Sequence, residues 1–200
     1  MKAYVMEFIG AFFLVLAIGL TGNPLAIGLT LAAMVYLGGH VSGAHYNPAV
    51  TLAVWLSGNL KKAKIIPYML SQVLGSLVAS YVIVYLGKEL FPKPSVEFFP
   101  ALLVEILFTF MFIAVILTVT SKRFKGNYIY GFAIGLALAV GALVGGPISG
   151  GVYNPAVMLG PAILRFVSGA GYPSLLIGLY ILGPVLGAIL AARIIGYLNK

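Results

Sequence analysis

The sequence predicts an all-α membrane protein with six membrane-spanning helices and two shorter half-helices, arranged as an inverted repeat. Two observations lead to this fold class. The 200-residue chain is 62% hydrophobic and only 8% charged, whereas a soluble domain carries about a quarter charged residues. The stretch SGAHYNPAV (42–50) also recurs as SGGVYNPAV (149–157). We therefore expect a single transmembrane domain over 1–200, with repeats of about 1–90 and 95–200.

A transmembrane helix needs about 20 mostly apolar residues, and six segments meet this requirement. Helix-breaking stretches such as Gly38-Gly39 and Gly145-Gly146-Pro147 separate these segments. The basic and apolar N-terminus resembles a signal peptide, but Glu7 interrupts it and no small-residue cleavage site follows, so we expect a retained first span. The six predicted spans are 3–21, 24–41, 65–87, 98–120, 127–145 and 173–197.

Two further apolar segments, 47–57 and 154–166, are too short to span a membrane, and each begins with Asn-Pro-Ala. Asparagine is a favoured N-cap, and proline suits the first helical turn. We therefore expect Asn47 and Asn154 to cap two half-helices, with extended backbone before them over 39–46 and 145–153. Such backbone is tolerated at membrane depth only where it is buried in protein or lines a water-filled cavity.

The basic residues predict the orientation of the chain. With six spans, one side of the membrane carries Lys2, Lys61, Lys62, Lys64, Lys122, Arg123, Lys125, Arg193 and Lys200, and the other carries Lys88, Lys93 and Arg165. Cytoplasmic loops are enriched in lysine and arginine, so we expect a multi-pass protein of the cell membrane with both termini in the cytoplasm. The half-helices then enter from opposite faces, and paired interruptions of this kind indicate a site at the midplane.

The two half-helix N-termini predict what the site can pass. Each carries about half a positive charge, which opposes cations. The side-chain amides of Asn47 and Asn154 can donate hydrogen bonds there. A water molecule that accepted both bonds would point its hydrogens away from the centre and so interrupt a chain of proton transfer. The pattern predicts a pore for neutral solutes that excludes protons.

The composition argues against other function classes. Cysteine is absent, which excludes disulfides, thiol nucleophiles and cysteine metal sites. The net charge of +8 is accounted for by cations beside membrane spans, and no basic helix with interleaved aromatics indicates nucleic-acid binding. The sequence shows neither a nucleophile–base pair nor a cofactor motif nor metal-ligand spacing. We therefore expect no enzyme, no cofactor and no metal site.

Three segments resemble the aquaporin, or major intrinsic protein, family: GHVSGAHYNPAVT (39–51), AIGLALAVGALVGGPISGGVYNPAVMLGPA (133–162) and GPVLGAILA (183–191). The resemblance covers essentially the whole chain. It implies a homotetramer in the lipid bilayer, in which each subunit holds its own channel for water and small neutral solutes. It also implies a pore centre made of Asn47, Pro48, Ala49, Asn154, Pro155 and Ala156.

Three ionisable residues lie near this predicted centre. Charge within a span is costly, so Glu7 and Glu105 are expected to be functional or paired. As pore ligands they would attract cations. The resemblance implies instead that they support the re-entrant loops from behind the pore wall, and we favour that role. His45 can act as a pH gate or as a hydrogen-bonded residue at the cytoplasmic pore mouth, and we favour the second role.

The resemblance also implies an outer selectivity filter made of Ile27, Ala142, Gly151 and Val157. The family usually has an arginine at the last position, where this chain has valine. Arg165 lies about 12 Å further along a helix, too far to replace it. A filter without a side-chain donor is either wider than one that passes water alone or closed by dewetting.

Several functions remain open at this stage. The first is a passive channel for water and small uncharged solutes with this atypical apolar filter. The alternatives are a channel mainly for ammonia, carbon dioxide, hydrogen peroxide or small polyols with slow water flow, and a non-conducting membrane scaffold. A proton-coupled transporter that uses Glu7 and Glu105 is the least favoured.

Overall fold

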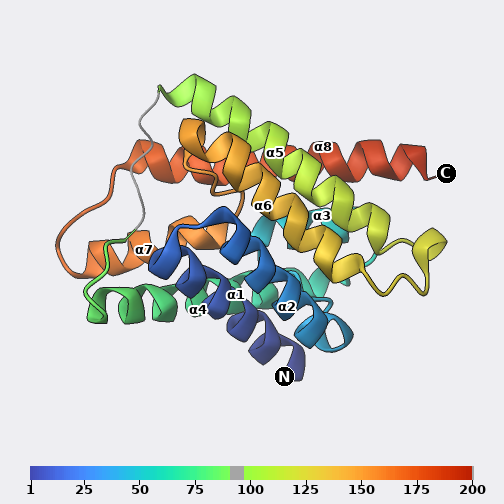
Figure 1. Ribbon diagram of the computed structural model, residues 1–200, viewed down its shortest axis with the longest axis horizontal. Coiled ribbons are helices and arrows are strands. Elements are labelled where there is room, and N and C mark those ends of the chain that lie inside the picture. The colour runs from blue at the N-terminus through green and yellow to red at the C-terminus, as the bar shows by residue number, and fades with distance from the viewer. Residues whose placement is uncertain (91–96, 200) are drawn as a thin grey trace.

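The computed structural model describes residues 1–90 and 97–199, and the chain is helical through most of these residues (Figure 1). Its helices are α1 Lys2–Thr21, α2 Pro24–Ser42, α3 Pro48–Leu56, α4 Ile65–Tyr85, α5 Phe98–Val119, α6 Tyr130–Ser149, α7 Pro155–Val167 and α8 Ser174–Leu198, with short 3-10 turns η1 Lys62–Lys64 and η2 Lys122–Phe124. Within the described residues six helices are long and apolar enough to cross a membrane, and α3 and α7 are shorter. The predicted fold class is confirmed. Lys93 and Lys200, which the orientation argument used, lie outside the described residues.

The helices pack in two matching sets. Helix α1 contacts α2 and α4, and α5 contacts α6 and α8 in the same way. Helix α3 packs on α8, and α7 packs on α4, so each half-helix contacts a long helix of the other set. In Figure 1 the α5–α6 connection and the C-terminus lie at one end of the molecule, and the α7–α8 connection lies at the opposite end. Each half-helix therefore contacts both α4 and α8.

Helices α2 and α6 join the two sets at a crossing of very small residues. A Cβ atom on Gly28 would collide with the carbonyl oxygen of Gly135, and a Cβ atom on Gly135 would collide with that of Gly28. Ala32 and Ala139 lie beside these glycines. Small residues let helix backbones approach closely, which is the main way in which helices associate within membranes.

The prediction that Gly38-Gly39 and Gly145-Gly146-Pro147 break the second and fifth spans is wrong. Helix α2 continues to Ser42 and α6 continues to Ser149. Two of these glycines make room for tyrosines rather than ending a helix: a Cβ atom on Gly38 or Gly145 would collide with the hydroxyl of Tyr46 or Tyr153. The non-helical backbone is therefore shorter than predicted and begins at Gly43 and Gly150.

Candidate functional site

Each re-entrant loop begins with a glycine in the left-handed region and returns to that region at the tyrosine before the asparagine. Gly43 and Gly150 have φ of 92° and 91°, and Tyr46 and Tyr153 have φ of 51° and 47°. A left-handed backbone costs a residue with a side chain roughly 1–2 kcal/mol, so both tyrosines need support from their surroundings. Several hydrogen bonds supply that support.

Glu7 holds the first loop from α1. Its carboxylate accepts hydrogen bonds from the backbone N–H groups of His45 at 3.0 Å and Tyr46 at 2.6 Å. Ser42 Oγ also donates to it at 2.6 Å, and Gln72 Nε2 donates at 2.7 Å. Glu7 is 0% exposed, and neither cavity described below has it in its wall. Its contacts are those of a group that fixes backbone rather than one that meets a solute.

Glu105 holds the second loop from α5 in the same way. It accepts from the backbone N–H groups of Val152 at 2.9 Å and Tyr153 at 2.7 Å, and from Ser149 Oγ at 2.8 Å. Hydrogen bonds to a charged acceptor stabilise a fold by about 1.5–3 kcal/mol each. These donors therefore offset part of the desolvation of the two fully buried carboxylates.

Tyrosine hydroxyls attach the same loops to the long helices. Tyr46 Oη donates to the Met34 carbonyl at 2.8 Å, and Tyr153 Oη donates to the Gly141 carbonyl at 2.9 Å. A second pair acts on the last residues of α2 and α6, where Tyr68 donates to the Ser42 carbonyl and Tyr180 donates to the Ser149 carbonyl. Side chains from α1, α2 and α4 thus hold the loop before Asn47, and side chains from α5, α6 and α8 hold the loop before Asn154.

Asn47 and Asn154 meet where the two half-helices begin. Each side-chain oxygen accepts the N–H of the following alanine, Ala49 at 2.8 Å or Ala156 at 3.0 Å, as an N-cap does. Each side-chain nitrogen donates across to the opposite loop: Asn47 Nδ2 lies 2.8 Å from the Tyr153 carbonyl oxygen, and Asn154 Nδ2 lies 3.1 Å from that of Tyr46. A carboxamide has two N–H donors, so these bonds leave a second N–H on each amide for a solute.

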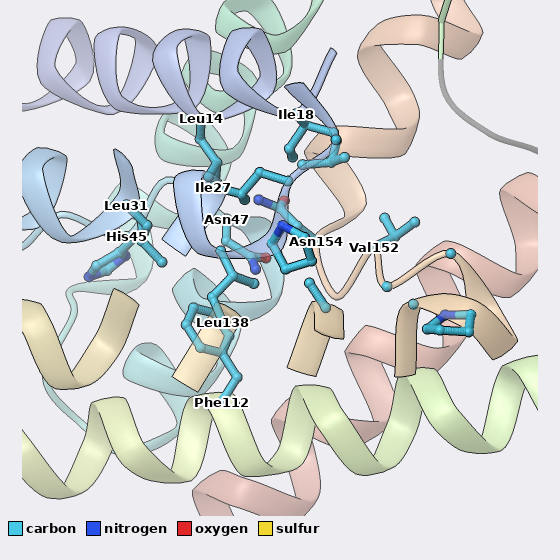
Figure 2. A pocket seen from close by; sticks show the side chains of 18 residues that line it. Leu14, Ile18, Ile27, Leu31, His45, Asn47, Phe112, Leu138, Val152 and Asn154 are labelled. Atoms are coloured by element: carbon cyan, nitrogen blue, oxygen red, sulfur yellow. The ribbon is translucent and has the colours of Figure 1, made fainter. Parts of the chain in front are cut away.

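An outer cavity of about 370 Å³ contains this asparagine pair. Figure 2 shows both amides at its centre, with His45 and Leu31 on one side and Val152 on the other. Ile27, Ala142, Gly151 and Val157, the predicted filter, all line this cavity. The lining residues that carry polar side chains are His45, Asn47 and Asn154, and the remaining wall is apolar or glycine backbone.

A second cavity of about 750 Å³ lies on the side that the basic residues assign to the cytoplasm. The two cavities share Leu31, His45 and Phe112. His45 therefore lies at their junction, deeper than the mouth where we expected it. Its Nδ1 lies 3.2 Å from Thr51 Oγ1, which also accepts a hydrogen bond from Gln72 Nε2 at 2.9 Å.

Arg165 lies away from the predicted outer filter, as its distance from Val157 along α7 predicts. Its guanidinium donates to the Leu90 carbonyl at 3.2 Å and lies 5.5 Å from the centre of the Tyr172 ring. Burial raises the pKa of Tyr172, and the charge of Arg165 partly offsets that rise. Arg165 is thus engaged at the α7–α8 connection, and it does not line the outer cavity.

Several residues of the site were not predicted. Leu14 and Phe112 line the outer cavity, and each lies about two helical turns after a buried glutamate. The matched spacing could have identified this pair. Ser42 and Ser149 open the repeated stretch and bind the glutamates, which the repetition also signalled. Gln72 could not be found by comparing the two halves of the chain. It lies four residues after Tyr68, and the residue four after Tyr180 in α8 is Pro184.

Comparisons with known proteins agree with this architecture. The sequence profile described as "Major intrinsic protein" matches residues 1–195. Glycerol uptake facilitator protein-like 6 of Lactiplantibacillus plantarum is 37% identical in an alignment 219 positions long, which covers 96% of this chain and 95% of that protein. Aquaporin NIP1-1 of Zea mays is 38% identical over 187 residues, covering 90% of this chain and 64% of that protein.

A solved structure matches the fold. The X-ray structure of the aquaglyceroporin from Plasmodium falciparum superposes with a TM-score of 0.83 over 99% of this chain and 96% of that chain, at 21% identity. At that identity the match speaks for the fold alone. The profile and the relatives identify the family: the chain belongs to the major intrinsic protein family, whose members are membrane channels for water and small solutes.

Proposed function

We propose that the chain is a passive, proton-excluding channel for water and small uncharged solutes, with a wide apolar outer filter. The observation that carries this proposal is the composition of the outer cavity wall. Ile27, Ala142, Gly151 and Val157 line it together, and none of their side chains can donate a hydrogen bond. A charged or strongly hydrated solute would have to shed its water shell there without replacement partners.

The size and polarity of the cavity favour small polyols among the permeating solutes. Its volume of about 370 Å³ far exceeds the roughly 30 Å³ that one water molecule occupies. The carbon skeleton of a polyol can contact Ile27 and Val157 while its hydroxyls reach the asparagine amides. The relative named as a glycerol uptake facilitator-like protein supports this preference.

The asparagine pair supports proton exclusion. Helices α3 and α7 begin at the pair, so their positive ends face one another. A water molecule held by one N–H from each amide accepts two hydrogen bonds and cannot also accept one from a neighbouring water. A continuous proton relay through the centre is thereby interrupted.

Flux measurements in reconstituted liposomes test the proposal. We expect osmotic shrinkage and glycerol uptake faster than in empty liposomes, linear in solute gradient, while a trapped pH indicator reports no added proton leak. Permeability equal to that of empty liposomes would favour the scaffold instead. Saturable uptake driven by a pH gradient would favour a coupled transporter.

We also propose that the channel is a homotetramer in the cell membrane. The support is the family to which the chain belongs together with exposed apolar residues on the long helices, among them Leu29, Leu103 and Leu143. Mass spectrometry of the protein released from detergent tests the oligomeric state. A monomer as the dominant species would contradict this part of the proposal.

A further inference from the structure

We propose that the cytoplasmic cavity is a binding site for a phosphate-bearing anion, and that the bound anion obstructs the pore. The binding stands on the geometry of the cavity alone. The obstruction rests on the proposed channel function. The source of the anion is either a free phosphorylated molecule or a phospholipid headgroup, and both present the same chemistry to the cavity.

The cations that line this cavity come from two separate turns. Lys64 is the last residue of η1, directly before α4, Lys122 is the first residue of η2, and Lys125 directly follows η2. Neutral hydrogen-bonding groups lie among them, including Asn59, Ser121 and Asn127. Of the described residues that line the cavity, none is acidic. The wall therefore combines positive charge with donors, which is the chemistry that phosphate oxygens bind.

The direction of the lysines, rather than their number, is the informative feature. Enrichment of cations on the cytoplasmic side is general and does not require them to face a cavity. Lys61, Lys62 and Arg123 belong to the same two turns and do not line this one, whereas Lys64, Lys122 and Lys125 do. The cavity volume of about 750 Å³ lies in the range of small-molecule sites.

Two buried groups sharpen the choice of ligand. Ser121 lines the cavity, and its buried Oγ has no hydrogen-bond partner among the described residues, so a rotation of the side chain toward the cavity would pair it with an oxygen of the ligand. Glu7 does not line the cavity but is hydrogen-bonded to Ser42 and His45, which do, and its carboxylate is already bound by Ser42, Gln72 and two backbone N–H groups. The positive charge of the cavity is thus not neutralised from within.

Occupation of the cavity would block the solute route. Leu31, His45 and Phe112 are the residues that it shares with the outer cavity, so a solute that passes between the two cavities passes them. A neutral solute can cross this junction of two apolar side chains and one imidazole. A phosphate cannot, because it would lose its water and its lysine partners. The anion therefore stays in the cavity and lowers the permeability.

Inorganic pyrophosphate is a suitable probe because it carries two phosphate groups and does not cross lipid. We expect it to bind the purified full-length protein in calorimetry, and to lower glycerol permeability in phosphatidylcholine liposomes when present on both sides. The triple variant K64Q/K122Q/K125Q should bind it roughly tenfold more weakly, since it loses three charge pairs. The matched control K61Q/K62Q/R123Q removes the same charge from the same face and should behave as the wild type.

A second experiment distinguishes a phospholipid headgroup from a free phosphorylated molecule as the source of the anion. Liposomes that contain phosphatidylglycerol, without pyrophosphate, should show lowered permeability that K64Q/K122Q/K125Q restores if the headgroup is the ligand. Inhibition by pyrophosphate in phosphatidylcholine alone indicates a free anion. Equal loss of inhibition in both triple variants, or neither pyrophosphate nor phosphatidylglycerol acting on the wild type, would overturn the proposal. Pyrophosphate binding to a protein that conducts nothing would instead leave the site standing and refute the channel function.

Discussion

Val157 follows the second Asn-Pro-Ala at a place where the family usually has an arginine. It is 1% exposed and lines the outer cavity beside Ile27 and Ala142. Its isopropyl group adds neither a positive charge nor a donor, so solutes meet an apolar surface at this level. If the chain conducts as proposed, we expect the main barrier to cations at the two half-helix ends beside the asparagine pair.

Replacing Val157 by arginine tests the role of this residue as a filter. The guanidinium would occupy part of the outer cavity and supply donors that suit water. We expect the ratio of glycerol to water permeability to fall roughly tenfold, which is a barrier change of about 1.4 kcal/mol. Stopped-flow light scattering of proteoliposomes measures both rates, with Val157→Leu as the uncharged control. An unchanged ratio would show that Val157 does not line the constriction.

Glu105→Gln tests the buried loop support. The carboxamide would place an NH2 group against one of its donors, Val152 N–H, Tyr153 N–H or Ser149 Oγ. We expect the protein to lose about 1.5–3 kcal/mol of stability, seen as a lower melting temperature in detergent. Glu89→Gln is the control, since Glu89 is exposed. Equal melting temperatures for the two variants would contradict a structural role for Glu105.

At the scale of helices, the glycine crossing of α2 and α6 brings the two halves of the chain together. The carbonyl of Gly28 faces the Cα of Gly135, and the reverse is also true. Ile27 on α2 and Ala142 on α6 line the same cavity, so the depth of this crossing sets the distance between two walls of the outer filter. The packing of α2 on α6 therefore sets where Ile27 and Ala142 lie relative to one another.

Gly28→Ala should push α2 and α6 apart. The added methyl group would overlap the Gly135 carbonyl and Ala139, and overpacking of this kind costs roughly 1–3 kcal/mol. We expect a lower melting temperature and a changed solute permeability. Gly178→Ala on α8 is the matched control, because a Cβ atom there meets open space. Equal melting temperatures for the two variants would contradict the close approach of α2 and α6.

At the scale of the whole molecule, the six long helices and the distribution of lysine and arginine predict the orientation in the membrane. The structure places the α5–α6 connection and the C-terminus at one end and the α7–α8 connection at the other (Figure 1). The larger group of cations lies at the first end, which the positive-inside rule assigns to the cytoplasm. We therefore expect the cytoplasmic cavity and its three lysines to face the cell interior.

Single cysteines test this orientation directly, because the chain contains none of its own. Lys88→Cys, an exposed position after α4, should react with a membrane-impermeant maleimide in intact cells. Lys125→Cys, between α5 and α6, should react only after the membrane is permeabilised. The opposite labelling pattern would reverse the topology and place the lysine-lined cavity outside.

The spans, the half-helices and the asparagine pair could be predicted from the chain because their signals are local. A run of apolar residues is long enough to cross a bilayer or it is not, and Asn-Pro marks a helix start within two residues. The repeated stretch also predicted a relation between distant segments, because it shows that the two half-helices occupy equivalent positions in the two halves of the chain. Hydrophobicity and capping depend mainly on neighbours along the chain, so they can be read from it.

Other features depend on which surfaces converge in space. The glycines before each loop, predicted to break helices, lie within α2 and α6, where Gly38 and Gly145 leave room for the hydroxyls of Tyr46 and Tyr153. Phe112, on a helix far along the chain from Leu31 and His45, joins them between the two cavities. Lys64 faces the cytoplasmic cavity while Lys61 does not. Side-chain direction and close backbone approach arise when distant segments pack, and no window along the sequence contains that information.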